Sequence, residues 1–229
     1  MKDSKVKTEL ITAASVITAA IVTGVLLALT LPSNLPLWMA AIGAFFAVIV
    51  VKQFFGGLGG NFLNPAMAGR ALIWISWLPI ILELPNAPVL FGISENTVLW
   101  VKALALFGGG VYLIARKVIN WEIPVLFIGI VAVGTLLLGW FNEVLSIDWL
   151  LHILSGGLVL GAFFMATDPV TTPMTRLGRI YFGIGCGVLT FILRGWGNAE
   201  QSVVFAILVM NVTVPLIDKI SMPRKRIRG

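Results

Sequence analysis

The chain has 229 residues, of which 59% are hydrophobic and only 11% carry a charge. Soluble domains carry about 25% charged residues, so this composition excludes a large soluble core and indicates an integral membrane protein. The net charge of +6 lies largely near the two ends, a pattern that favours membrane topology and contact with anionic lipid headgroups over nucleic-acid binding. One cysteine, Cys186, excludes a disulfide framework or a metal cluster built from this chain's own thiols, and no metal site is predicted.

A membrane-spanning helix needs about 20 predominantly apolar residues. On this criterion we expect an all-α polytopic membrane protein with about eight transmembrane helices. The expected spans are 10–31, 37–51 with a continuation to 55, a third segment ending near 81, 99–115, 123–140, 149–166, 179–193 and 202–217. The prediction is a single integral membrane domain over residues 1–229, with a cytoplasmic N-terminus (1–9), a transmembrane bundle (10–217) and a basic cytoplasmic tail (218–229).

The distribution of basic residues supports this topology. With the N-terminus inside, every lysine and arginine except Lys102 and Arg194 lies toward the cytoplasm. Cytoplasmic connections carry such an excess in membrane proteins. We therefore expect both termini in the cytoplasm and the protein in a prokaryotic inner membrane.

A Gly-rich stretch, residues 54–70, interrupts the apolar sequence after the second span. In lipid, irregular backbone survives only where protein or a polar cavity surrounds it. Pro65 cannot continue a helix from upstream but can begin one, and Asn64 before it is a favoured N-cap residue. The amides of Asn61 and Asn64 could converge on a heteroaromatic ring. The stretch therefore predicts a ligand site, with a plain capped helix start as the alternative.

A second interruption follows the sixth span. Both stretches read Gly-Gly-Leu, then aromatic and apolar residues, then Asn-Pro or Asp-Pro, then Gly-Arg. Paired breaks of this kind are the best sequence indication of a binding site in repeat-built membrane proteins. We expect two broken-helix pseudo-repeats, and Pro169 to begin a helix that Asp168 caps.

The chain resembles a known family at these residues. The matching segments are 22–29, 35–38, 56–71, 155–157, 164–170, 206–211 and 215–218. They are similar to the membrane component shared by two ion-pumping redox complexes, namely the D subunit of the Rnf complex and the B subunit of the sodium-pumping NADH:quinone oxidoreductase. The resemblance implies ten spans in two five-span halves, and this chain would start near the third span.

The resemblance also implies roles for individual residues. Asn61 and Asn64 match residues that hold riboflavin noncovalently, whereas Asp168 and Asp218 match acidic residues implicated in cation transport. An ionisable residue within a membrane segment is a functional candidate by default. The alternatives are an N-cap for Asp168 and an interfacial ion pair with Lys219 for Asp218. The candidate cofactor-binding residues are Gly60, Asn61, Asn64, Pro65 and Arg70, and the candidate ion-path residues are Thr167, Asp168 and Asp218.

Family members carry a Ser-Gly-Ala-Thr motif in an outer loop, and its threonine esterifies an FMN phosphate. In this chain Ser94 and Thr97 keep the spacing, but Glu95 and Asn96 replace the Gly-Ala pair. A carboxylate beside a phosphoester is electrostatically unfavourable. Thr97 is thus the candidate for covalent FMN, and we expect that FMN to be absent or carried elsewhere in the complex.

Other residues have simpler interpretations. Arg70 either binds an anion, pairs with Asp168 or extends to the cytoplasmic interface. The only histidine, His152, cannot form a haem or zinc site alone. Small residues around Cys186 predict close helix packing. Trp74 and Trp77 could stack on a flavin, although core packing is the simpler interpretation.

Taken together, the sequence predicts a membrane subunit of an Rnf- or Nqr-type ion-translocating electron-transport complex. It would relay electrons through flavin and contribute to a Na⁺ or H⁺ path. The chain carries no motif for NADH, ferredoxin or a cluster, so we expect partner subunits and no catalysis by this chain alone. The alternative is a non-redox ion transporter or channel-like subunit on the same broken-helix scaffold.

Overall fold

The computed structural model describes residues 2–57, 59–84, 95–139, 153, 157–196 and 199–222. Throughout this part of the chain the regular structure is helical, which confirms the all-α class. The chain divides into two compact units, Met1–Ala87 and Pro88–Gly229, and each is described by itself. The prediction of one transmembrane bundle therefore stays a prediction.

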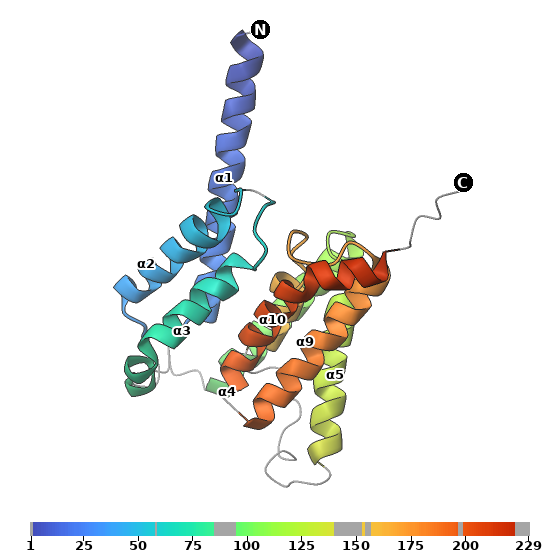
Figure 1. Cartoon of the computed structure of the whole chain (residues 1–229). Coiled ribbons are helices and arrows are strands. Elements are labelled where there is room, and N and C mark those ends of the chain that lie inside the picture. Colours follow the sequence, from blue (N-terminus) through green and yellow to red (C-terminus); the bar gives the residue numbers. More distant parts are fainter. Residues whose placement is uncertain are drawn as a thin grey trace, which may run out of the picture. The chain divides into compact units, whose positions relative to one another are not determined.

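The described part of the first unit contains α1 (Lys2–Thr30), α2 (Leu37–Phe45), the π-helix η1 (Phe46–Gln53) and α3 (Pro65–Glu83), as Figure 1 shows in blue to green. Its apolar cluster is formed by Leu35, Met39, Ile73 and Ile81, with Trp74 and Trp77 packed against it. The Trp77 ring also meets Trp38 edge-on at 5.3 Å between centroids. Trp74 and Trp77 thus take part in core packing.

Close approach of η1 and α2 to α3 depends on small residues. A Cβ on Gly69 of α3 would lie 2.6 Å from the Gly43 carbonyl oxygen and 3.1 Å from the Ala47 Cβ. Small residues let membrane helices approach to backbone contact. On the other side, the Lys52 ammonium donates to the Ala19 carbonyl at 3.1 Å and to the Thr23 hydroxyl at 3.2 Å, which ties η1 to α1.

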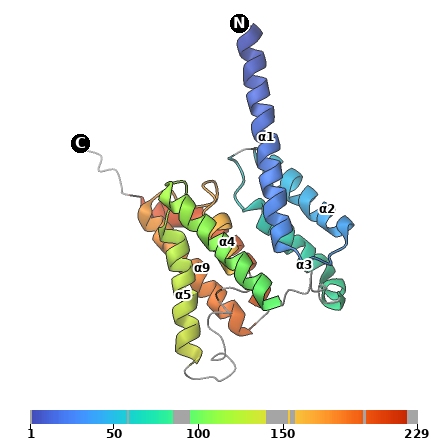
Figure 2. The ribbon, with the colours of Figure 1, turned by 180° about the vertical axis from the view of Figure 1, so that it is seen from behind.

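The second unit contains α4 (Glu95–Ala115), α5 (Glu122–Gly139), α8 (Leu158–Leu160), η3 (Gly161–Met165), α9 (Arg176–Trp196) and α10 (Ala199–Ser221). Helix α9 packs along both α5 and α10, and Figure 2 shows α4 and α5 from behind. Gly183 and Gly187 of α9 lie against α5, where an added Cβ would meet the backbone of Ile123 or Phe127. Cys186 between them is fully buried, as predicted for a packing residue.

The described helices agree well with the predicted spans. In the described part of the chain, four segments are long and apolar enough to cross a membrane: Thr12–Thr30, Pro65–Glu83, Arg176–Gly195 and Gln201–Ser221. Shorter apolar helices cover Leu37–Gln53, Trp100–Ala115 and Glu122–Leu137. Of the predicted sixth span, 149–166, residues 149–152 and 154–156 lie outside the described residues, and the described part is helical at 153 and from 158 to 165.

Candidate functional site

The first break begins with a change of hydrogen-bond register. In η1 the Phe54 N–H donates to the Ile49 carbonyl at 3.1 Å, a π-type bond. The chain then turns through Gly56, Gly57 and Gly59, whose φ values of 110°, 76° and 84° favour glycine. π-Helical segments occur frequently at functional sites. The sequence predicted the turn but not the π-helix.

The predicted helix start at Asn64 and Pro65 is confirmed. Pro65 is the first residue of α3, and the Asn64 Oδ1 accepts from the Met67 N–H at 3.1 Å. Asn61 is buried as well, and its Nδ2 donates to the Leu63 carbonyl at 3.0 Å. These two bonds use the oxygen of one amide and the nitrogen of the other. The break is thus a capped helix start, and it carries two buried amides.

The groups around these amides are of the types that bind a planar aromatic ligand. Phe55 and Phe62 lie on either side of the glycines, at least 45% exposed, with their rings edge-on at 4.8 Å between centroids. A Cβ on Gly60 would collide with the Phe55 carbonyl, so this glycine is required by the turn itself. Buried amide groups beside accessible rings match the donors, acceptors and apolar face of an isoalloxazine. The residues present therefore fit a flavin.

The second break differs from the prediction. Pro169 does not begin a helix, and the prediction that Asp168 caps one is wrong. Instead the Asp168 Oδ1 accepts from the Val170 N–H at 3.1 Å, and its carbonyl accepts from the Thr171 N–H at 3.1 Å and the Thr172 hydroxyl at 2.9 Å. This is an Asx turn, which Asp favours. Helix α9 starts only at Arg176, where the Gly178 N–H donates to the Thr175 hydroxyl at 2.9 Å.

The two breaks nevertheless share a feature that the sequence did not reveal. A π-helix precedes each Asx-Pro pair, η1 in the first unit and η3 in the second. The two Gly-Gly-Leu sequences are not structurally equivalent, because Gly56 and Gly57 follow η1 whereas Gly157 precedes η3. The structural repeat is therefore a π-helix followed by an Asn-Pro or Asp-Pro pair, which starts a helix in the first unit and forms a turn in the second.

All three candidate ion-path residues contact the segment that links η3 to α9. The buried Thr167 hydroxyl donates to the Phe163 carbonyl at 2.6 Å, and Asp168 forms the turn that follows. The Asp218 Oδ1, from the end of α10, accepts from the Met174 N–H at 3.0 Å. Asp218 thus holds this loop rather than pairing with Lys219. The structure brings two carboxylates and a buried hydroxyl to one loop.

One buried carboxylate was not among the predicted site residues. Glu122, at the start of α5, is 5% exposed and lies 3.3 Å from Arg176 Nε and 3.6 Å from an Arg179 nitrogen. Arg179 in turn donates to the Met174 carbonyl at 3.1 Å, so it connects Glu122 to the same loop. In the sequence, Glu122 is a single acidic residue on a connection rich in basic residues. A topology analysis that counts only lysines and arginines does not consider it.

Several predictions fall beyond what is described. Thr97 lies in the first turn of α4, which begins four residues earlier than predicted, but its side chain is outside the described residues, as are Ser94 and His152. A pairing of Arg70 with Asp168 would join the two units and stays a prediction. Among the described residues no group of three or more His, Cys, Asp or Glu side chains could hold a metal ion.

Comparison with known proteins gives a consistent result over nearly the whole chain. The model of the NQR2, RnfD, RnfE family matches residues 5–84 and 83–226. The chain belongs to this family. Family membership agrees with the resemblance at the two breaks, because both lie within the matched segments.

Individual relatives within the family are named as D subunits. The chain is 38% identical to the D subunit of the Na⁺-translocating ferredoxin:NAD⁺ oxidoreductase complex of Acetobacterium woodii, over 90% of this chain and 72% of that protein. It is also 38% identical to the D subunit of the proton-translocating ferredoxin:NAD⁺ oxidoreductase complex of Clostridium ljungdahlii, over 90% of this chain and 74% of that protein. The D subunit of the ion-translocating oxidoreductase complex of Stutzerimonas stutzeri is 34% identical, with 90% and 75% covered. These first two relatives are equally similar to the chain but are named for different ions. Sequence identity therefore does not indicate which ion is translocated.

Proposed function

We propose that the chain is the D-type membrane component of an Rnf-type ion-translocating ferredoxin:NAD⁺ oxidoreductase complex. The similarity to D subunits, which extends over 90% of the chain, carries this proposal. The chain works with other membrane and peripheral subunits, and it does not catalyse the overall reaction alone. The non-redox transporter is disfavoured because these relatives are all named as subunits of oxidoreductase complexes.

Electron transfer at the first break would use a noncovalently bound riboflavin. Asn61 and Asn64 would contact the polar edge of the ring system, and Phe55 and Phe62 would cover its apolar face. The flavin, when bound, supplies one- and two-electron redox chemistry, whereas the protein supplies binding, orientation and electrostatics. The positive end of the α3 dipole, which begins at Pro65, favours negative charge at this end of the helix.

Ion movement would involve the loop between η3 and α9. Asp168 and Asp218 supply two carboxylates there, and Thr167 adds a buried hydroxyl. Thr190 of α9 and Asn211 of α10 are also buried polar residues within apolar helices. Polar residues inside membrane segments are costly and frequently mark ion pathways. Hard cations such as Na⁺ prefer carboxylate, carbonyl and hydroxyl oxygens, the groups gathered in this loop.

The test of the flavin assignment is the visible spectrum of the purified complex before and after acid precipitation. Noncovalent riboflavin at the first break predicts yellow flavin in the supernatant, and its amount falls in an Asn61→Ala variant. Flavin that remains in the pellet would instead indicate a covalent attachment, with Thr97 as the candidate. A complex in which this chain carries no flavin would contradict the proposed electron relay.

A further inference from the structure

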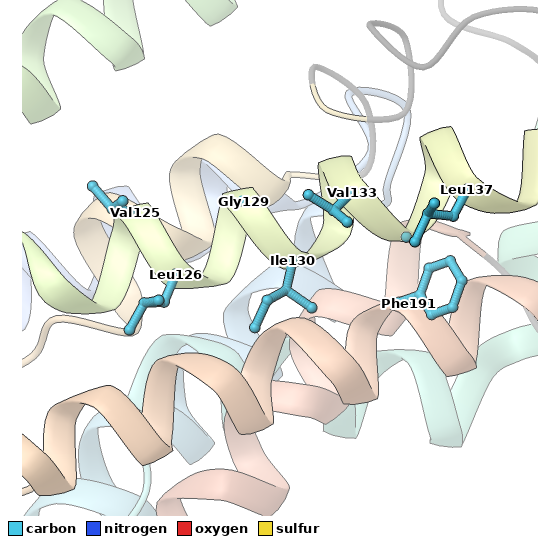
Figure 3. A pocket seen from close by; sticks show the side chains of 8 residues that line it. Val125, Leu126, Gly129, Ile130, Val133, Leu137 and Phe191 are labelled. Atoms are coloured by element: carbon cyan, nitrogen blue, oxygen red, sulfur yellow. The ribbon is translucent and has the colours of Figure 1, made fainter.

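An apolar groove runs along α5 in the second unit. It has a volume of about 350 Å³ and is lined by residues of α5 and by Phe191 of α9 (Figure 3). The α5 residues Val125, Gly129, Val133 and Leu137 follow one another at intervals of four, so they share one face of the helix. Val125, Val133 and Leu137 are each more than half exposed. The described residues that line the groove carry no polar side chain.

Gly129 keeps the middle of the groove open. A Cβ at this position would meet nothing within 4 Å, whereas a Cβ at Gly134 would collide with the Phe191 ring. Gly134 is therefore required for the packing of α5 on α9, but Gly129 is not. From Val125 to Leu137 the helix rises about 18 Å, which exceeds half of the roughly 30 Å hydrocarbon core. The groove thus has the length of one acyl chain in one leaflet.

The same helix face leads to a cationic surface. Trp121 lies four residues before Val125 and so continues the same row. The guanidinium of Arg176 lies 5.8 Å from the centroid of the Trp121 ring. The Arg176 side chain is 68% exposed, although its Nε contacts Glu122. Arg116 and Lys117, in the turn that leads into α5, are exposed as well. Tryptophan and arginine at the end of a membrane helix mark the level of lipid headgroups.

We propose that this surface binds one anionic phospholipid. An acyl chain lies in the groove along Val125, Gly129 and Val133, and the phosphate lies at Arg176, with Arg116 and Lys117 nearby. The Glu122 carboxylate does not repel the headgroup strongly, because it is buried against two guanidinium groups. The match of an apolar groove to a positive patch at one end identifies a lipid with a negative headgroup rather than a neutral one.

Native mass spectrometry of the delipidated full-length protein tests this proposal. The protein is offered equal amounts of phosphatidylglycerol and phosphatidylcholine with identical acyl chains, and bound lipid is counted. The wild type retains an excess of phosphatidylglycerol. Arg176→Gln lowers the ratio of the two bound lipids about fivefold. Gly129→Leu fills the groove and lowers binding of both lipids about tenfold.

Gly108→Leu is the matched control, because a Cβ on this α4 glycine also meets nothing within 4 Å. It binds lipid as the wild type does. Equal lipid binding by Gly129→Leu and Gly108→Leu would overturn the acyl-chain site. An unchanged lipid ratio in Arg176→Gln would overturn the headgroup site. A lipid bound by the isolated chain but absent from the intact complex would show that a partner protein, not a lipid, covers this face.

Discussion

Asn64 caps α3, and in the proposed site it would also contact the flavin. Asn64→Ala removes the acceptor of the Met67 N–H and is expected to cost about 1 kcal/mol of stability. Asn64→Asp keeps this acceptor but replaces the amide by a carboxylate. We expect both variants to lose riboflavin, and only the alanine variant to lose thermal stability. If Asn64→Asp bound as much flavin as the wild type, the amide of Asn64 would serve only as the N-cap of α3.

Glu122 is the residue whose removal most directly tests the packing of the second unit. Glu122→Gln removes the charge that faces Arg176 and Arg179 while it keeps the side-chain volume. Removing one partner of a buried ion pair costs about 3 kcal/mol. Because the Arg176 side chain is 68% exposed, we expect about 1–2 kcal/mol here, so the melting temperature of the purified protein should fall. Glu83→Gln, at the exposed end of α3, is the control and should leave the melting temperature unchanged. Equal melting temperatures for both variants would contradict this role.

The contrast between Asn64 and Asp168 shows what local sequence can and cannot predict. Asn64, followed by Pro65, caps α3 as predicted, because cap and proline act within one turn. Asp168 precedes a proline too, but the cap of α9 is Thr175, whose hydroxyl accepts from the Gly178 N–H. The Asx turn at Asp168 is an alternative to helix initiation, and the loop that follows it also makes a tertiary contact with Asp218, which local sequence does not reveal.

At the scale of elements, the helices were predictable and the π-helices were not. The spans follow from apolar length alone, and most of their ends agree with the described helices to within a few residues, although α1 begins at Lys2, eight residues before the predicted first span. A π-helix differs from an α-helix by one residue in hydrogen-bond register and has no composition of its own. The pairing of Glu122 with α9 is likewise a tertiary contact, which joins residues 54 or more apart in the sequence.

The packing of α3 on α2 and η1 gives a prediction at this scale. A larger side chain at Gly69 must displace the Gly43 carbonyl or Ala47. Gly69→Val is therefore expected to lower stability by about 1–3 kcal/mol, measured as a lower melting temperature. Gly108→Val makes the same change where there is open space and should be tolerated. If Gly69→Val were tolerated equally well, the close approach of these helices would be wrong.

For the whole molecule, the number of spans determines on which side the C-terminus lies. An even number of spans places both ends on the same side of the membrane, and the distribution of basic residues predicts that this side is the cytoplasm. A C-terminal fusion to green fluorescent protein should then fluoresce, and a fusion to alkaline phosphatase should be inactive. The reverse pattern would place the C-terminus outside and contradict the predicted topology.

In the proposed function, this protein couples electron transfer to ion movement. Inverted membrane vesicles from a strain that lacks the protein, complemented with wild type or Asp168→Asn, test it directly by recording ferredoxin-dependent NADH formation and cation uptake together. Asparagine can still accept from the Val170 N–H, so the turn is kept while the charge is lost. The wild type should restore both activities, and Asp168→Asn should restore flavin binding and NADH formation without cation uptake. The proposed coupling would be contradicted if Asp168→Asn vesicles, or vesicles without the protein, showed both cation uptake and NADH formation at wild-type rates.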